Sequence, residues 1–178
     1  VMAHVKECYE TRKPVDEIVH NKLNDLVRLY LLVGGMPEVV QKYINTNNLQ
    51  IVRATQLDIM HLYTKDISKY DPQNKLYIKD IFELIPSELN AKNKRFILKA
   101  LNEKAKFERY SNSFLWLADA GVALPVYNVE EPRLPLKLGE QRNLFKLFLS
   151  DVGLLASQYA ANIAIEILTG DAKINYGA

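Results

Sequence analysis

Few side chains in this sequence have the types and spacing that catalysis or metal binding requires. His4, His20 and His61 stand at no metal-ligand spacing from one another or from Cys8, the single cysteine. No nucleophile accompanies a base, and no pair of carboxylates is set up for acid–base work. The sequence therefore predicts no catalytic residue and no metal site, and a single cysteine excludes an internal disulfide.

Positive charge is concentrated in the segment 92–109. This segment holds seven basic residues against two acids, whereas the net charge of the whole chain is +2. Such a cluster is typical of a surface that contacts the phosphates of nucleic acid. A solvated face, or a surface that docks on another domain, also explains it, and we favour this because the charge precedes the next helix instead of lying along it. The basic residues are Lys92, Lys94, Arg95, Lys99, Lys104, Lys106 and Arg109.

The helix after the basic segment is predicted over 110–121, entered through the polar residues at 110–112. Gly121 can take the left-handed conformation that ends a helix. From Val122 the apolar period changes to two, which predicts a strand over 122–129. A proline-bearing loop, 130–142, then leads to a second strand over 144–149. Helix, strand, long loop and returning strand form the back half of a winged helix.

The composition is that of an ordinary globular protein. The 178 residues are 48% hydrophobic and 25% charged, and their number suffices for one sizeable domain or two small ones. No apolar run approaches the length of a membrane span, and the charges scattered through 1–14 do not fit a secretory signal. We therefore expect a cytoplasmic protein without membrane contact.

The first half of the chain is predicted to be helical. A first helix follows Pro14 and is opened by Asp16, whose negative charge suits a helix N-terminus. Gly34 and Gly35 end this helix, and Pro37 suits the first turn of the next one. We therefore expect a sharp corner between two packed helices. The face that the first helix would bury holds Ile18, Val19, Leu23, Leu26, Val27, Tyr30 and Leu31.

Two further helices should precede the basic segment. One spans about 49–69, burying Leu62 among others and leaving Arg53 toward water. The other, capped by Asp71, runs from 72 to 85 with Leu76 inward, and Pro86 should end it. The stretch 96–98 is either a short strand or the front of a helix. After the second strand, Asp151 should cap another helix.

Five blocks of the sequence jointly resemble one protein family. This is the group of prokaryotic predicted ATPases of the AAA+ superfamily, in which a P-loop domain is followed by a conserved domain of unknown function. The resemblance covers nearly the whole chain, and the blocks follow the family's order. They are LLVGGMPEVVQKYI (31–44), YTKDISKY (63–70), FELIPSEL (82–89), WLADAGV (116–122) and FKLFLSDVGLL (145–155).

The resemblance implies a middle fragment of such a protein. The phosphate-binding pattern G-x-x-x-x-G-K-[ST] does not occur in these residues, and family members continue past Ala178 into a region resembling the restriction-endonuclease fold. The implied fold is mostly α with a small β element. It consists of a helical lid-like segment (1–70), a winged helix-turn-helix (71–160) and the start of a truncated C-terminal region (161–178).

The resemblance also implies cofactors and partners. ATP and magnesium are expected in the full-length parent and no cofactor in this fragment. The missing P-loop domain and C-terminal region are the expected partners, with another protein or DNA as further ones.

The resemblance marks Gly35 and Pro37 as residues on the adenine side of a nucleotide, because related P-loop ATPases place a G-x-P corner there. A glycine lets the backbone approach a base closely, and a proline stiffens the wall beside it. A corner without a ligand explains both residues as well, and we favour it. Tight ATP binding by this fragment alone is not expected.

Four other residues in or near these blocks allow two interpretations each. The acids Asp58, Asp66 and Glu83 could serve an interdomain contact or sense nucleotide, but solvated helix-surface acids are the interpretation we favour. Trp116 could stack on nucleic acid, although apolar residues at helical spacing usually face a core.

We predict a non-catalytic regulatory and recognition module of a putative ATP-binding AAA+ type protein. The alternative is a DNA-binding winged helix that uses 92–109. An independent enzyme is a distant third hypothesis.

Overall fold

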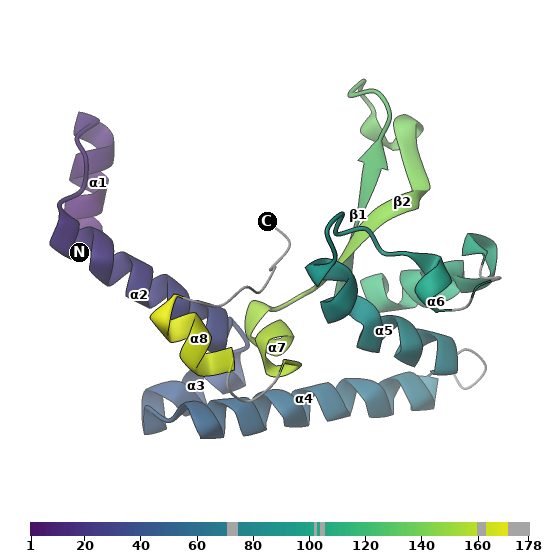
Figure 1. Cartoon of the computed structure of the whole chain (residues 1–178), viewed down its shortest axis with the longest axis horizontal. Helices are drawn as coiled ribbons and strands as arrows, with labels where there is room; N and C mark the ends of the chain where they lie inside the picture. The colour runs from purple at the N-terminus through teal and green to yellow at the C-terminus, as the bar shows by residue number, and fades with distance from the viewer. Residues whose placement is uncertain (71–74, 102, 104–105, 160–162, 171–178) are drawn as a thin grey trace.

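The computed structural model describes residues 1–70, 75–101, 103, 106–159 and 163–170 (Figure 1). These residues form a mostly helical fold with a small antiparallel sheet, as the sequence predicts. The helices and strands are α1 (Met2–Thr11), α2 (Glu17–Val33), α3 (Pro37–Thr46), α4 (Leu49–Tyr70), α5 (Lys75–Asn90), η1 (Leu98–Ala100), α6 (Phe107–Asp119), β1 (Ala123–Val129), η2 (Leu136–Gly139), β2 (Glu140–Leu149), α7 (Val152–Ser157) and α8 (Ile163–Thr169).

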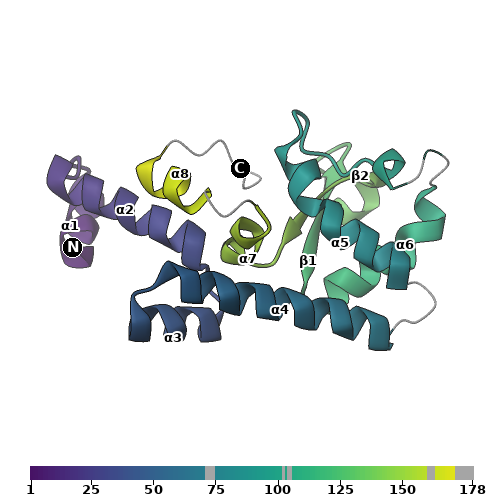
Figure 2. The same cartoon turned by 60° about the horizontal axis from the view of Figure 1, so that its bottom comes forward.

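The long helix α4 joins two regions, as both views show (Figures 1 and 2). We call α2, α3, α7 and α8 the helical region, and α5, α6, β1 and β2 the hairpin region. Near the start of α4, Val52 packs with Val33 and Val39 of the helical region. Near its end, Ile67 joins the core of the hairpin region. One helix thus contributes to both cores.

The core of the hairpin region is built around aromatic rings. Phe114 of α6 is 1% exposed and meets Phe145 of β2 edge to face, with ring centroids 4.9 Å apart. Phe96 lies edge-on to Phe114 at 5.4 Å, and Phe107 stacks on it at 6.0 Å. The rings join α6, β2 and the segment before η1 in one apolar cluster. Edge-to-face contact is one of the arrangements that aromatic rings prefer.

The two predicted strands occur and pair with each other, but β2 begins at Glu140, within the predicted loop, instead of at residue 144. β1 and β2 run antiparallel, with Ala123 opposite Leu149 and Tyr127 opposite Phe145; the register shifts after Tyr127. Gly121, which precedes β1, has a φ of +66°, the left-handed conformation expected where α6 ends. The chain can therefore turn from helix to strand within a few residues.

At 96–98 the structure assigns neither a strand nor the start of an α-helix. The Phe96 N–H donates to the Phe145 carbonyl at 3.0 Å, so an extended stretch borders β2. The 3-10 turn η1 begins two residues later, at Leu98.

The expected helical corner, the acid expected at the start of α2 and the cap expected at Asp151 are confirmed. α2 ends at Val33, and α3 begins at Pro37 in its first turn. The Asp16 carboxylate accepts the Val19 N–H at 3.0 Å at the start of α2, which lowers the pKa of Asp16. Asp151 caps α7. The cap predicted at Asp71 lies outside the described residues.

The buried face predicted for α2 is wrong over most of its length. Ile18 is 82% exposed, and Leu26, Val27 and Tyr30 are also exposed. α1 and the first half of α2 extend away from the rest of the described chain (Figures 1 and 2). The apolar period predicts a helix correctly, but it cannot say whether a partner covers its face.

The end predicted for α5 is also wrong, because Pro86 lies inside the helix. Contacts around this turn stabilise it: the Tyr159 hydroxyl donates to the Pro86 carbonyl at 3.2 Å, and Leu89 is buried in the core.

The start predicted for α6 is wrong as well, because the helix begins at Phe107 instead of residue 110. Phe107 packs on the core, and Tyr110 is buried within it.

Three side chains on α4 and α5 do not lie as predicted. Leu62 and Leu76 are exposed, whereas Arg53 is partly buried because its guanidinium donates to the Tyr159 carbonyl at 2.6 Å.

The end of the described chain packs back onto the helical region. Ala156 of α7 and Ile167 of α8 form a buried cluster with Leu32 of α2. Helix α7 therefore connects the last strand of the hairpin to α2. The predicted division of the chain into 1–70, 71–160 and 161–178 stays a prediction.

Candidate functional site

The helical corner and the end of the hairpin meet at one carboxylate, that of Asp151. Asp151 is 8% exposed and stands two residues after the end of β2. Its Oδ2 accepts the N–H of Gly35 at 2.6 Å, and its Oδ1 accepts the N–H of Leu154 at 2.9 Å. Such bonds to a charged acceptor are stronger than those between neutral groups. We call Asp151, Gly34, Gly35, Gly153 and Gln56 the Asp151 joint.

Two glycines allow the backbones in the joint to approach closely. A Cβ on Gly34 would collide with Oδ1 of Asp151, and Gly34 has a φ of +74° with a ψ of −162°, a combination almost confined to glycine. A Cβ on Gly153 would lie 2.6 Å from the Val33 carbonyl oxygen. Larger residues would force α2 and α7 apart.

Gln56 of α4 completes the joint. Its Nε2 donates to the carbonyls of Leu32 and Val33 at 2.7 and 3.2 Å, and the residue is buried. These carbonyls lie in the last turn of α2, where the helix itself supplies no N–H groups to bond them. The amide therefore satisfies acceptors that burial would otherwise leave unpaired.

Two tyrosines packed on the core have altered acidity. Burial, and secondarily the negative charge of Asp151, raise the pKa of Tyr63 above its ordinary value. Burial also raises the pKa of Tyr159, the residue whose carbonyl binds Arg53. Both phenols stay protonated at neutral pH and cannot act as bases there.

The joint fixes geometry and offers no group for catalysis. Each carboxylate oxygen of Asp151 already accepts a backbone N–H, so the carboxylate is a poor candidate for a general base. What the contact does is hold the start of α7, directly after the hairpin, against the corner after α2. The hydrogen bond spans 116 residues of sequence, and no local pattern could have indicated it.

Gly35 and Pro37, the predicted adenine-side residues, both lie at the corner. Both are exposed, Gly35 lies in the bend between α2 and α3, and Pro37 begins α3. The Gly35 N–H is committed to Asp151. Nucleotide contact by these residues stays a prediction.

The predicted basic residues lie on several short elements, and their role as a contact surface stays a prediction. Lys92 and Lys99 are exposed on the loop after α5 and on η1, and Lys106 is the N-cap residue of α6. The Arg109 guanidinium lies 4.9 Å from the centre of the Tyr77 ring and donates to the Tyr77 hydroxyl. Lys94 is partly buried with a φ of +52°, and Lys104 lies outside the described residues.

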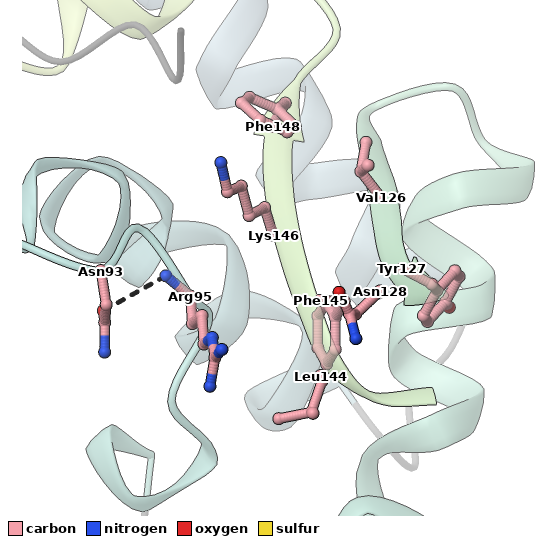
Figure 3. Close-up of a pocket in the computed structure, with 9 residues that line it drawn as sticks. All are labelled: Asn93, Arg95, Val126, Tyr127, Asn128, Leu144, Phe145, Lys146 and Phe148. Carbon is pink, nitrogen blue, oxygen red and sulfur yellow. Dashed lines mark hydrogen bonds between the residues drawn. The ribbon is translucent and has the colours of Figure 1, made fainter. Parts of the chain in front are cut away.

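Arg95 lines a groove of about 420 Å³ between its own loop and the outer face of the hairpin (Figure 3). Alternation along β2 sends Phe145 and Leu147 into the core and leaves Leu144, Lys146 and Phe148 on the outer face. Sequence reasoning missed Lys146, although this period-two pattern could have placed it. The lining residues are Asn93, Arg95, Val126, Tyr127, Asn128, Leu144, Phe145, Lys146 and Phe148.

The other acids and the histidine–cysteine pair show no catalytic arrangement. Asp58, Asp66 and Glu83 are exposed on helix surfaces. Cys8 Sγ lies 3.6 Å from His4 Nε2, and Asp16 Oδ2 lies 2.9 Å from the same nitrogen. A catalytic relay from carboxylate to thiol would need one ring nitrogen of His4 to face Asp16 and the other to face Cys8. Here both partners lie beside the same nitrogen, Nε2. Among the described residues, no group of histidine, cysteine or acidic side chains is arranged to hold a metal ion.

Fold and site define a mostly helical protein with an antiparallel hairpin, clamped together by a buried carboxylate. The chain belongs to the family described as Domain of unknown function (DUF8612), which matches residues 24–164. The whole Asp151 joint and the hairpin groove lie inside the matched residues. Neither the curated proteins nor the solved structures contain a match to the chain. In the part of the chain that the structure describes, no helix is both long and apolar enough to span a bilayer.

Proposed function

We propose that this chain is a regulatory and recognition module of a larger AAA+ type, ATP-binding protein of the cytoplasm, and that it is not catalytic by itself. The observation that carries the proposal is the hydrogen bond from Gly35 to Asp151. It joins two blocks, LLVGGMPEVVQKYI and FKLFLSDVGLL, on which the resemblance to that class rests. Two distant parts of the sequence that carry the resemblance are thus held together by one contact.

The proposed role follows from what the joint connects. The corner at Gly34 and Gly35 would face the nucleotide-binding domain of the parent, where ATP and magnesium would bind. Asp151 stands two residues after β2, so a change at the corner would reach the hairpin through one hydrogen bond. The hairpin region would then respond to the nucleotide state and present a surface to a partner.

The complete coding sequence around this chain tests the parentage. We expect an upstream P-loop, G-x-x-x-x-G-K-[ST], in the same reading frame. Calorimetric titration of residues 1–178 with Mg-ATP should show no micromolar binding, because the chain lacks that loop. A reading frame without a P-loop, or micromolar ATP binding by these residues alone, would contradict the proposal.

A DNA-binding winged helix is the second candidate. It is favoured by the order of elements: α5, the extended stretch at Phe96, η1, α6, β1 and β2 follow one another as in a winged helix. In that arrangement α6 would be the recognition helix. The exposed side chains on α6 include Asn112, Leu115 and Asp119, and Arg109 is held by Tyr77. This surface offers few donors for base edges or phosphates.

Salt-dependent duplex binding separates the two candidates. Phosphate contacts would give a slope of about −0.9 in log affinity against log salt for each phosphate neutralised. We expect no submicromolar binding of a 20-base-pair duplex at physiological salt. Salt-sensitive submicromolar binding that Lys94→Glu, Arg95→Glu and Lys99→Glu together abolish would favour the DNA-binding candidate instead.

A further inference from the structure

We infer that the hairpin groove binds an extended acidic peptide segment that also carries apolar side chains. The inference rests on the recognition role proposed above and names the partner of that role. It is carried by the chemistry of the groove's lining, which combines unpaired positive charge with an accessible apolar strip.

The positive charge comes from two side chains on opposite walls. Arg95 is exposed on the loop that follows α5, and Lys146 lies on the outer face of β2 (Figure 3). Within the described residues, neither side chain forms an ion pair, and none of the residues found to line the groove is acidic. Two cations that have no ion-pair partner in the described part of the chain make the groove complementary to carboxylates.

The apolar strip lies beside these cations. Val126 is 53% exposed, and Leu144 and Phe148 are partly buried on the same outer face of the sheet. Residues two apart on a strand share one face, so Leu144, Lys146 and Phe148 present apolar, charged and apolar groups in turn. An extended peptide with the same period of two could match this order.

Polar amides border the groove at its two walls. The Asn93 side chain accepts the N–H of Arg95 at 3.3 Å, which holds the loop in place. On the other wall, Asn128 donates to Gln141 at 2.8 Å across the hairpin. These local bonds stabilise both walls, so the groove is formed before a ligand arrives, as is usual for binding sites.

A peptide fits these features better than a nucleic acid does. Phosphates would pair with Arg95 and Lys146 but would leave Val126 and Leu144 against a charged backbone. Acidic peptides with aliphatic residues satisfy both parts of the lining. Duplex DNA is therefore the competing outcome of the test.

The test is selection from a random 12-residue peptide display library on the full chain, followed by anisotropy titration of the selected sequences. We expect peptides with at least two acidic and two aliphatic or aromatic residues. Arg95→Glu with Lys146→Glu should weaken their binding at least tenfold. A matched peptide with lysine in place of its acids should bind this variant better than the unchanged protein.

Two controls keep the result specific. Lys92→Glu with Lys99→Glu changes the net charge equally on exposed residues outside the groove, and it should change affinity less than threefold. Val126→Ser tests the apolar strip at an exposed position and should weaken binding severalfold without loss of folding by circular dichroism.

Other outcomes would overturn the inference. The first is that the selected peptides are not enriched in acidic residues. The second is that the Arg95 and Lys146 changes do not affect the binding of the selected peptides. The third is that no peptide is selected and that the same variant loses binding to duplex DNA. An upstream P-loop in the coding sequence would leave the proposed parentage intact even if the peptide inference failed.

Discussion

The hairpin region and the Asp151 joint hold their parts together in different ways. Rings of Phe96, Phe107, Phe114 and Phe145 fill the core of the hairpin region, and such packing depends mainly on volume and shape. The joint depends on single hydrogen bonds and on positions where only glycine fits. The first arrangement stabilises a fold, whereas the second fixes one relation between two elements. We therefore expect mutations to affect the two places differently.

The largest loss of stability should follow Phe114→Ala. The side chain is 1% exposed and contacts three other rings, so its removal leaves a cavity and should cost about 3–5 kcal/mol. Urea unfolding followed by circular dichroism measures this. Leu115→Ala is the control, because this neighbour on α6 is 55% exposed. An equal loss in both variants would contradict the account of the core.

Asp151→Ala should come next, with a loss of about 2–4 kcal/mol. The substitution removes an N-cap, worth about 1 kcal/mol, and leaves the Gly35 N–H without its acceptor, which costs about 1–3 kcal/mol more. Asp151→Ser separates the two effects, since serine can still cap α7 but its shorter side chain does not reach Gly35. If serine restored full stability, the bond to Gly35 would contribute nothing.

Gly34→Ala should cost about 1–3 kcal/mol from its backbone conformation alone, with a further cost from the collision with Asp151. Gly121→Ala provides the control, because Gly121 also has a positive φ but has open space where a Cβ would go. Thermal unfolding of both variants should show the larger loss for Gly34. Equal losses would mean that crowding against Asp151 has no effect.

Stability should also fall at alkaline pH, partly through Tyr63. The pKa of Tyr63 is raised in the folded protein by burial and by Asp151, so the unfolded chain loses this proton first, near pH 10. The contribution of Tyr63 to the free energy of unfolding is therefore complete below pH 10, and it declines as the pH rises through the pKa of Tyr63 in the folded protein. Unfolding of Tyr63→Phe between pH 8 and 11 should show a shallower decline. Parallel curves for the two proteins would exclude this role.

The smallest effect, with the opposite sign, is expected for Ser113→Ala. The Ser113 hydroxyl is buried in α6 and has no hydrogen-bond partner in the described structure. Its removal should leave stability unchanged or raise it by up to about 1 kcal/mol, because alanine also favours helix. Ser157→Ala is the control, since that hydroxyl donates to the Leu154 carbonyl at 2.7 Å and should lose about 0.5–1.5 kcal/mol.

Local signals in the sequence predicted much of the fold. The change to period two at Val122, the glycine at 121 and the capping residue Asp16 each act within a few residues, and each prediction is confirmed. The predicted corner between Val33 and Pro37 has the same local origin.

The errors arose where distant residues decide the outcome. Pro86 stays within α5, where Tyr159, 73 residues away, binds its carbonyl. The exposed apolar face of α2 shows that a helical pattern does not reveal its partner. In the candidate site, basic composition located Arg95, but only the contact of the following residue, Phe96, with the Phe145 carbonyl brings that loop beside the strand that carries Lys146. The joint itself requires a contact across 116 residues.

Hydrogen exchange of the Gly35 amide, followed by NMR, tests the coupling of corner and hairpin most directly. Gly35 is exposed as a residue but donates its N–H to Asp151. We predict that this amide is protected in the unchanged protein and exchanges at least tenfold faster in Asp151→Ser, while Leu154 stays protected. Equal exchange of Gly35 in both proteins would contradict the claim that Asp151 clamps the corner to the end of the hairpin.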